Sequence, residues 1–530
     1  PGEFDYAGYL SRRNCFYRFY PDSVIRTDKE NYSLLNINHL AGRVKNRMTS
    51  TWSGGGDGLA GLMAVTMGDK SALTGEIRES YSDAGGMHIL AVSGLHVGLI
   101  WIILERIFLF LTYIPGGKRV RSVLIIIILW FYAAIAGFSP SVCRSVTMFS
   151  LLSVSSALSR DRNSVNIVLL SALILLMINP AQIFEVGFQL SYLAVIGIIA
   201  IQPLLAGLCT TRYRIIRRMV DLSSVSIAAQ IATFPLSVFY FHQIPVYFLI
   251  TNLAAIPLLS CIVGLFIIST PFFLAQCLEK PFLWILENLT QLMNRIMELI
   301  SSIPGSTVNG LQMPVSKVVL VYLLIFFLLF SLKYRSIIYM MIIIILLSVL
   351  LLLSSVLLFK EKRLHRMIVP HFRGGTLITF VHGREANHFV TYDDSLSGAT
   401  IHNYIESNYG FRNMKSAGFQ IDTLEAYQNR YVSAVKLFEG CLLIVDGNAR
   451  VLVIDGSLNR SRPGFFSDYR ADAAILHRYK YYKATDSLYF SPETEIIING
   501  FNRTTVAERL VKGSSAPYIT ERDGAYIKNY

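Results

Sequence analysis

The segment His88-Ile-Leu-Ala-Val-Ser-Gly-Leu-His96-Val-Gly-Leu-Ile100 decides what class of protein this chain belongs to. It opens an apolar run that continues through Phe108-Leu-Phe-Leu111 and is long enough to span a bilayer. Because ionisable side chains at membrane depth are costly, the two histidines indicate a functional site. The small residues Ser93, Gly94 and Gly98 have a second interpretation, since they also let a neighbouring helix approach closely.

Composition is typical of a membrane protein rather than a soluble one. The chain is 53% hydrophobic and 16% charged, and its mean hydropathy is +0.47. The formal net charge of +13 fits the excess of Lys and Arg on the cytoplasmic side of membrane proteins, and it also fits a polyanionic substrate. The six cysteines show no Cys-x-x-Cys spacing, so they predict neither a disulfide framework nor a zinc site.

Successive apolar runs predict a polytopic α-helical membrane protein. We expect spans near residues 89–113, 121–138, 142–158, 164–178, 188–206, 222–241, 246–270, 315–332 and 336–359. Three loops are basic and are therefore placed in the cytoplasm, namely 118–121, 160–162 and 212–218. The loops at 137–140, 179–185 and 242–245 are not basic, so we place them outside, together with the N-terminal region.

Residues 281–304 leave the location of the C-terminal region open. Apolar residues recur there at helical spacing, and the opposite face carries polar side chains such as Glu287 and Asn294. If this helix crosses the membrane with its polar face towards a water-filled interior, the C-terminal region lies outside. If the helix lies on the membrane surface, that region is cytoplasmic. We adopt the outside location as the prediction.

After Lys360 the composition becomes that of a soluble α/β or α+β domain. Strand-like runs occur at 375–381, 388–392, 441–445, 451–454, 473–476 and 495–498. Several of them end in Asp-Gly or Asn-Gly turns, which are typical of tight connections between strands.

Five motifs resemble the ComEC-type competence DNA-uptake channel family. In chain order they are His88–Val97, Gly137-Phe-Ser-Pro-Ser-Val-Cys-Arg144, Gly187-Phe-Gln-Leu-Ser-Tyr-Leu-Ala194, His242-Gln-Ile-Pro245 and Asn252-Leu-Ala-Ala-Ile-Pro257. Members of that family carry a single DNA strand through the inner membrane during natural transformation. The resemblance therefore implies a channel for single-stranded DNA in the bacterial plasma membrane. It also implies partners: the lipid bilayer, DNA-receptor proteins, and a separate cytoplasmic ATPase, since no Walker A motif is present. Association of this chain into a homo-oligomer is left open.

A hydrated, cation-lined path is what a DNA strand needs inside a bilayer. The candidate path residues are His88, Ser93, Gly94, His96, Arg144, Gln189, His242 and Asn252. Arg144 follows Pro140 and could hold a phosphate at a helix N-terminus, or it could be an arginine that snorkels to the membrane interface. His88 and His96 are roughly 12 Å apart along a continuous helix, so they cannot share a metal ion unless the helix is broken.

A second group of candidates lies near the N-terminus. Phe16, Tyr17, Arg18 and Tyr20 belong to a basic, aromatic run that could stack on bases. A simple strand is the alternative interpretation. The opening Pro1–Tyr6 resembles the end of the family's extracytoplasmic OB-fold domain, so we expect a fragment that lacks upstream sequence.

Composition, hydropathy and the resemblance together predict six regions along the chain. They are an OB-fold-like remnant (1–50), amphipathic linker helices (51–88), a competence-type transmembrane domain (89–280), an amphipathic or pore-facing helix (281–304), two further transmembrane helices (305–360) and a soluble α/β domain (361–530).

The soluble domain departs from the family. Many relatives end in a metallo-β-lactamase-like domain, whose metal site needs a His-x-His-x-Asp-His cluster. Here the histidines are scattered at 365, 371, 382, 388, 402 and 477. We therefore expect a degenerate domain of that fold, with no metal site, no cofactor and no enzymatic activity. The alternative functions are a small-solute or ion transporter with a regulatory C-terminal domain, and a membrane-tethered hydrolase.

Overall fold

The computed structural model divides the chain into two compact units, residues 1–308 and 309–530, each of which is described by itself. It describes residues 37–49, 52, 56–158, 163–208, 211–275, 277–311, 313–363, 365–372, 375–383, 385–392, 395–405, 415–438, 440–447, 449–455, 470–477, 488–489, 491, 493–499, 511–512, 518–520 and 525–529. The base-stacking candidates Phe16, Tyr17, Arg18 and Tyr20 lie outside these residues.

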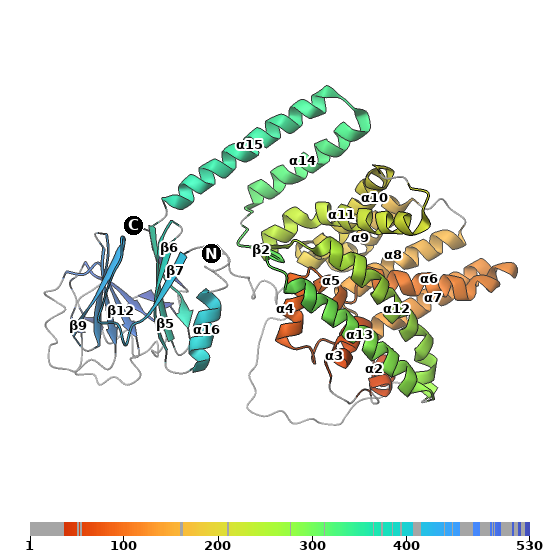
Figure 1. Ribbon diagram of the computed structural model, residues 1–530, viewed down its shortest axis with the longest axis horizontal. Helices are drawn as coiled ribbons and strands as arrows, with labels where there is room; N and C mark the ends of the chain where they lie inside the picture. The colour runs from red at the N-terminus through yellow and green to blue at the C-terminus, as the bar shows by residue number, and fades with distance from the viewer. Residues whose placement is uncertain are drawn as a thin grey trace. The chain divides into compact units, whose positions relative to one another are not determined.

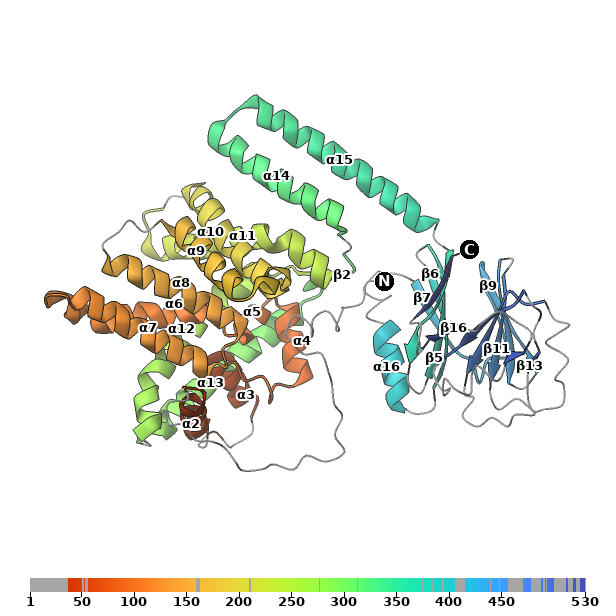
Figure 2. The ribbon, with the colours of Figure 1, turned by 180° about the vertical axis from the view of Figure 1, so that it is seen from behind.

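The first unit is helical (Figures 1 and 2). Its helices are α2 (Ile37–Thr49), α3 (Asp57–Met67), α4 (Gly75–Asp83), α5 (Met87–Leu90), α6 (Gly94–Ile107), η1 (Phe108–Tyr113), α7 (Gly117–Ile135), α8 (Pro140–Ala157), α9 (Ser164–Ile178), η2 (Pro180–Phe184), α10 (Val186–Leu208), α11 (Arg214–Phe241), α12 (Phe248–Ala275) and α13 (Glu279–Ser301). A short strand pair joins β1 (Gln243–Pro245) to β2 (Thr307–Asn309).

Six helices in the described part of the chain are long and apolar enough to cross a membrane. They are Gly94–Tyr113, Val186–Leu208, Arg214–Phe241, Phe248–Phe273, Val315–Tyr334 and Ile337–Lys360. The protein is therefore a polytopic membrane protein, as the hydropathy predicts. The expected spans at 121–138, 142–158 and 164–178 are helices too, but α7 begins with basic residues, α8 is rich in hydroxyl side chains, and α9 is short.

The expected span 89–113 is interrupted. The chain is helical at Met87–Leu90, extended at Ala91, and helical again only from Gly94. A single continuous helix through His88 and His96 is thus wrong, and the two histidines belong to different helices.

Close packing of α3 against α13 places these helices in the core of the first unit. A Cβ at Gly58 would lie 2.7 Å from Cγ of Gln291, and a Cβ at Gly61 would lie 2.8 Å from Cγ2 of Thr290. These contacts require glycine, because no larger residue allows so short a distance between helices. α3 is buried along most of its length and so differs from an amphipathic linker helix.

α13 is amphipathic, and its buried face contacts α3, α4 and α12. Asn294 on that face accepts a hydrogen bond from the Tyr81 hydroxyl (2.8 Å) and donates one to the Asp57 carbonyl (3.1 Å). Asn294 therefore serves helix packing within the bundle, whereas Asn288, Arg295 and Glu298 are exposed. An isolated helix lying on the membrane surface would not make these contacts.

The second unit starts with a helical hairpin, α14 (Val315–Tyr334) and α15 (Ile337–Lys362). Its side chains are almost entirely apolar, yet few of them are buried in protein. Large exposed apolar surfaces of this kind are stable in contact with lipid. The hairpin is therefore a pair of membrane spans.

The remainder of the second unit is rich in β-structure. One sheet has the strand order β17-β3-β5-β6-β7, with β4 paired to β5. Its strands are β3 (His365–Val369), β4 (His371–Phe372), β5 (Gly375–His382), β6 (Glu385–Tyr392), β7 (Lys415–Gln420) and β17 (Tyr526–Asn529). The other sheet has the order β16-β14-β12-β11-β10-β9-β8 and is built from β8 (Ala426–Gln428), β9 (Val432–Phe438), β10 (Cys441–Asp446), β11 (Ala449–Asp455), β12 (Ala473–His477), β14 (Glu495–Ile498) and β16 (Tyr518–Ile519).

The two sheets bury one shared core. Phe380 and Phe389 of the first sheet pack in the same cluster as Ile444, Val453 and Ile475 of the second. On the outer side of the first sheet, α16 (Ser395–Ile405) packs against β5 and β6. The domain is therefore a two-sheet sandwich, and all six strand-like runs of the sequence form strands in it.

Candidate functional site

The break before α6 is held by a side-chain contact between Ser93 and His96. The Ser93 backbone N–H donates to Nδ1 of His96 (3.1 Å), and the Ser93 Oγ lies 3.0 Å from the same nitrogen. This satisfies a backbone donor that the helix start leaves free. Because Nδ1 accepts, the ring proton resides on Nε2. Nε2 is buried and has no hydrogen-bond partner among the described residues.

Gly94 and Gly98 let α8 approach α6. A Cβ at Gly94 would lie 3.2 Å from Oγ of Ser145, and one at Gly98 would lie 2.9 Å from Cζ of Phe149. These two glycines thus have the close-packing role that was the alternative interpretation. The packing leaves His96 fully buried between the helices.

Arg144 lies on α8, one turn after Pro140 at the start of that helix. Its side chain is 4% exposed, so it does not snorkel to the rim of the bundle. Nη2 lies 3.5 Å from the position of a Cβ on Gly187 of α10, and Glu185 and Tyr192 lie within electrostatic range. Within the described parts of the chain, Nε has no hydrogen-bond partner and no carboxylate oxygen lies within 4.0 Å of the guanidinium.

The motif His242–Pro245, and Thr251 just before the motif Asn252–Pro257, pack against the segment that precedes α5. Pro245 of β1 packs against Gly85, just before α5, where a Cβ would be 2.9 Å from the proline ring. Gln243 donates a hydrogen bond to Ser82 (3.0 Å). The Thr251 hydroxyl donates to the Ala84 carbonyl (2.6 Å). Segments that are far apart in sequence therefore pack against residues 82–85, which lead into the helix that carries His88.

The remaining candidates differ in their surroundings. Gln189 is engaged in packing, since it donates to the Ile183 carbonyl (2.8 Å) and accepts from the Tyr240 hydroxyl (3.0 Å). His242 is exposed and ends α11 with a left-handed backbone (φ 56°). His88 is exposed on α5. Asn252 is half-buried, and its Oδ1 has no partner among the residues that the structure describes.

Sequence reasoning missed one buried ion pair. Arg121 of α7 donates to Glu105 of α6 (Nη2 to Oε2, 2.7 Å), and the two side chains are 9% and 17% exposed. The sequence placed Arg121 in a cytoplasmic loop, but it lies inside α7, where its charge faces the neighbouring helix. Its position contained the signal, since Arg121 lies about 200° around the helix from Arg119, so the two arginines face different sides.

In the soluble domain two of the scattered histidines come together. His365 and His382 are paired across β3 and β5, and their ring centroids are 5.1 Å apart. Nε2 of His382 lies 2.5 Å from Oδ1 of Asp446, and its ring stacks on Tyr431 at 4.8 Å. No group of three or more His, Cys, Asp or Glu side chains suited to a metal ion occurs among the described residues.

Comparison with known proteins agrees with this arrangement. The family described as "Competence protein" matches residues 65–335. The chain belongs to the competence protein family. The match includes every helix from α4 to α14 and all five quoted motifs.

The relatives are longer than the matching region. The chain is similar to ComE operon protein 3 of Bacillus subtilis (strain 168), with 27% identity over 48% of this chain and 32% of the relative. It is also similar to an uncharacterized protein of Aquifex aeolicus (strain VF5), with 26% identity over 48% of this chain and 56% of that protein. The match to YcaI, an uncharacterized protein of Escherichia coli (strain K12), is 22% identical over 38% of this chain and 27% of the relative. The chain therefore spans between about a quarter and just over half of the length of these relatives. No solved structure matches it.

Proposed function

We propose that this protein conducts single-stranded DNA through the bacterial plasma membrane during natural transformation. The observation that carries the proposal is Arg144, a buried guanidinium that has no carboxylate in contact among the described residues and lies beside Gly187 of a second family motif. A buried arginine that only stabilised the fold would be paired, as Arg121 is with Glu105. An unpaired one suits an anion that binds transiently, such as a backbone phosphate.

His96 supports the same proposal. Its Nε2–H is buried and unpartnered in the described structure, so it can donate to a passing phosphate or to water. Because a DNA strand cannot lose the hydration of its phosphates in lipid, donors fixed on rigid helices are what a path requires. The capping contact with Ser93 fixes the ring of His96 in this way.

The connectivity supports an extracytoplasmic C-terminal domain. The basic residues at the start of α11 favour a cytoplasmic location for that end, so β1, after the other end of α11, faces outside. β2 pairs with β1 and is therefore on the outer side as well. α14 then runs inward to the basic Lys333–Arg335 turn, and α15 returns outward. In this arrangement the basic residues that follow Lys360 lie outside, which is an exception to the positive-inside rule.

We also propose that the soluble domain is not a hydrolase. The side chains that a metal would need are engaged elsewhere: His382 contacts Asp446, and Nδ1 of His388 lies 3.0 Å from the Thr379 hydroxyl. The driving force would then come from a separate cytoplasmic ATPase, with DNA-receptor proteins delivering the strand. Stoichiometric zinc in the purified full chain would contradict this part of the proposal.

DNA uptake in cells tests the main proposal. The gene is deleted and then restored with the wild type, Arg144→Ala, Arg144→Lys or His96→Ala, and labelled DNA is followed. We expect DNA to become protected outside the plasma membrane in every strain, but to reach the cytoplasm only with the wild type and, partly, with Arg144→Lys. If the deletion leaves cytoplasmic DNA unchanged, the channel function is wrong and the transporter function takes its place.

The membrane side of the soluble domain needs its own measurement. Reporter fusions after Lys362 would distinguish the two sides, because alkaline phosphatase is active only outside the cytoplasm. We expect high phosphatase activity there and low activity for a fusion at Lys333. The reverse pattern would place the domain in the cytoplasm.

A further inference from the structure

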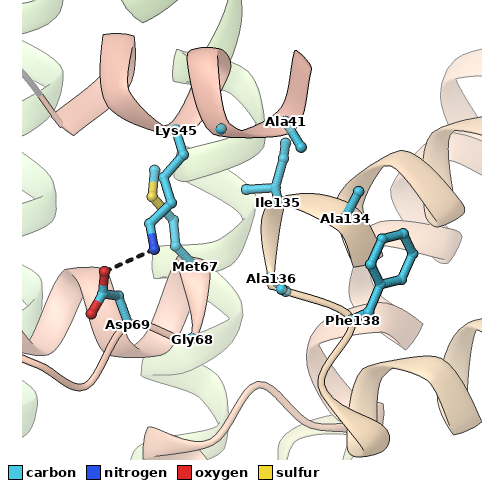
Figure 3. A pocket seen from close by; sticks show the side chains of 11 residues that line it. Ala41, Lys45, Met67, Gly68, Asp69, Ala134, Ile135, Ala136 and Phe138 are labelled. Atoms are coloured by element: carbon cyan, nitrogen blue, oxygen red, sulfur yellow. Dashed lines mark hydrogen bonds and ion pairs between the residues drawn. The ribbon is translucent and has the colours of Figure 1, made fainter. Parts of the chain in front are cut away.

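A pocket of ≈510 Å³ opens where α2, α3 and the end of α7 meet (Figure 3). Lys45 of α2 faces Asp69 on one side of it, with 2.8 Å between Nζ and Oδ2. Ile135 and Ala136 form the facing wall, and Phe138 lies at the edge away from the ion pair. The Lys45 and Asp69 side chains are 29% and 24% exposed, so solutes can reach both.

Two left-handed turns shape this pocket. Gly68 ends α3 with φ 72°, and Gly137 follows α7 with φ 68°. Phe138 also has a positive φ of 48°, a conformation that is strained for a residue with a side chain. The small residues at the turns leave room between the helix ends, and the strain at Phe138 is concentrated at the rim of the resulting pocket.

The helix beside the pocket is basic. α2 carries Arg43, Lys45 and Arg47 and has no acidic residue. Lys70 follows directly after Asp69, and burial, together with the charge of the neighbouring Arg78, lowers the pKa of the Lys70 ammonium. The three basic residues of α2, with no acidic residue beside them in that helix, make this side of the pocket attractive to anions.

The pocket lies at the end of α7 opposite to Lys118, which begins the helix. If the basic end of α7 is cytoplasmic, the pocket faces outside. α8 starts just beyond the pocket at Pro140, and Arg144 follows one turn further along that helix, a rise of about 6 Å. A strand arriving from outside would meet the pocket before Arg144.

We propose that the pocket holds one nucleotide of the arriving DNA strand, with Lys45 on the phosphate and the apolar wall of Ala134, Ile135 and Ala136 against the base. The proposal rests on the proposed function and adds a binding site to it. The volume is sufficient for a single nucleotide. Asp69 competes with the phosphate for Lys45 and keeps the contact weak, which a moving strand requires, since sites on a conduction path must also release.

Gly42 provides a test that changes no charge. It lines the pocket within α2, and a Cβ at this position would have no atom within 4 Å. Gly42→Leu therefore adds an apolar side chain at the pocket lining, and its Cβ has room. Gly207→Leu on α10 is the matched control, because a Cβ there is equally free. Binding of a fluorescein-labelled oligo(dT) to the full chain in lipid nanodiscs is measured by anisotropy at low salt.

We expect Gly42→Leu to weaken binding about fivefold or more, and Gly207→Leu to leave it unchanged. The ion pair adds a second signature. Lys45→Gln should weaken binding, whereas Asp69→Asn should strengthen it about threefold by freeing Lys45. Equal binding by the two leucine variants overturns the proposal, as does a shift in the same direction for Lys45→Gln and Asp69→Asn. Size-exclusion profiles identify any variant that has not folded. If Gly42→Leu has not folded, the binding of Lys45→Gln and Asp69→Asn decides whether the pocket binds DNA.

Uptake in cells separates this proposal from the proposed function. If restoring the wild-type gene restores cytoplasmic DNA but Gly42→Leu behaves as the wild type in both assays, the channel stands and the pocket does not bind DNA. If deletion of the gene leaves uptake unchanged while Gly42→Leu still weakens oligonucleotide binding, the pocket binds DNA but the channel function is wrong.

Discussion

Replacing Arg144 by methionine should have opposite effects on function and on stability. The side chain is 4% exposed and its Nε has no partner among the described residues. A buried donor without a partner costs about 1–3 kcal/mol. Methionine keeps much of the aliphatic length and removes the donor, so Arg144→Met should raise the melting temperature by about 2–6 °C, at about 2 °C per kcal/mol. DNA import should fall at least about tenfold.

Arg121 offers the matched comparison. It is also a buried arginine in the first unit, and its Nε likewise has no partner among the described residues, but its Nη2 is paired with Glu105 at 2.7 Å. Arg121→Met leaves the Glu105 carboxylate buried without its partner, which costs about 3–5 kcal/mol. The melting temperature should therefore fall by about 6–10 °C.

Thermal unfolding in detergent and DNA uptake in cells are measured on the same variants. The reasoning is refuted if Arg144→Met lowers the melting temperature as Arg121→Met does, since Arg144 would then be a structural residue. It is equally refuted if Arg144→Met is more stable and imports DNA normally. Arg144→Lys, which keeps the charge, should retain part of the import activity.

Three further predictions concern packing, pH and thiol reactivity. A Cβ at Gly197 would clash with Cβ of Ala232, so Gly197→Ala should destabilise the α10–α11 pair by about 1–3 kcal/mol. Adding Ala232→Gly in a double variant should restore the stability, which thermal unfolding measures. Burial lowers the pKa of His388 from 6.5 to about 4, so as the pH falls the unfolded chain takes up this proton before the folded chain does. The contribution of neutral His388 to folding stability should therefore be full above pH 6.5 and be lost as the pH falls towards 4. His388→Gln should remove that part of the pH dependence of unfolding. Burial raises the pKa of the Cys441 thiol to about 12, so a maleimide should label this cysteine only after the soluble domain unfolds. Labelling of Cys441 in the folded protein as fast as in the unfolded protein would contradict its buried position.

Much of the architecture was predictable because a segment that spans the membrane must be apolar and long enough to cross the hydrocarbon layer. Apolar length predicted the helices around α10, α11, α12, α14 and α15, since an unsatisfied backbone is too costly in hydrocarbon for any other structure. Strands such as Cys441–Val445 were also predictable, because these segments are apolar and end at turn residues. The break at Ala91–Ser93 was not predictable, since it depends on the Ser93–His96 contact and on the packing of α8 against Gly94.

The sequence by itself determined that this chain is a polytopic membrane protein with a soluble domain and the motifs of its family, because hydropathy and motif order are local properties. Only the tertiary structure decided which polar groups are paired. Arg121 and Arg144 look alike in sequence, yet one faces Glu105 and the other faces Gly187. That difference depends on which helix packs alongside, which local sequence does not contain. The free energy of a buried charge depends on this neighbour, and so does the function that we assign to it.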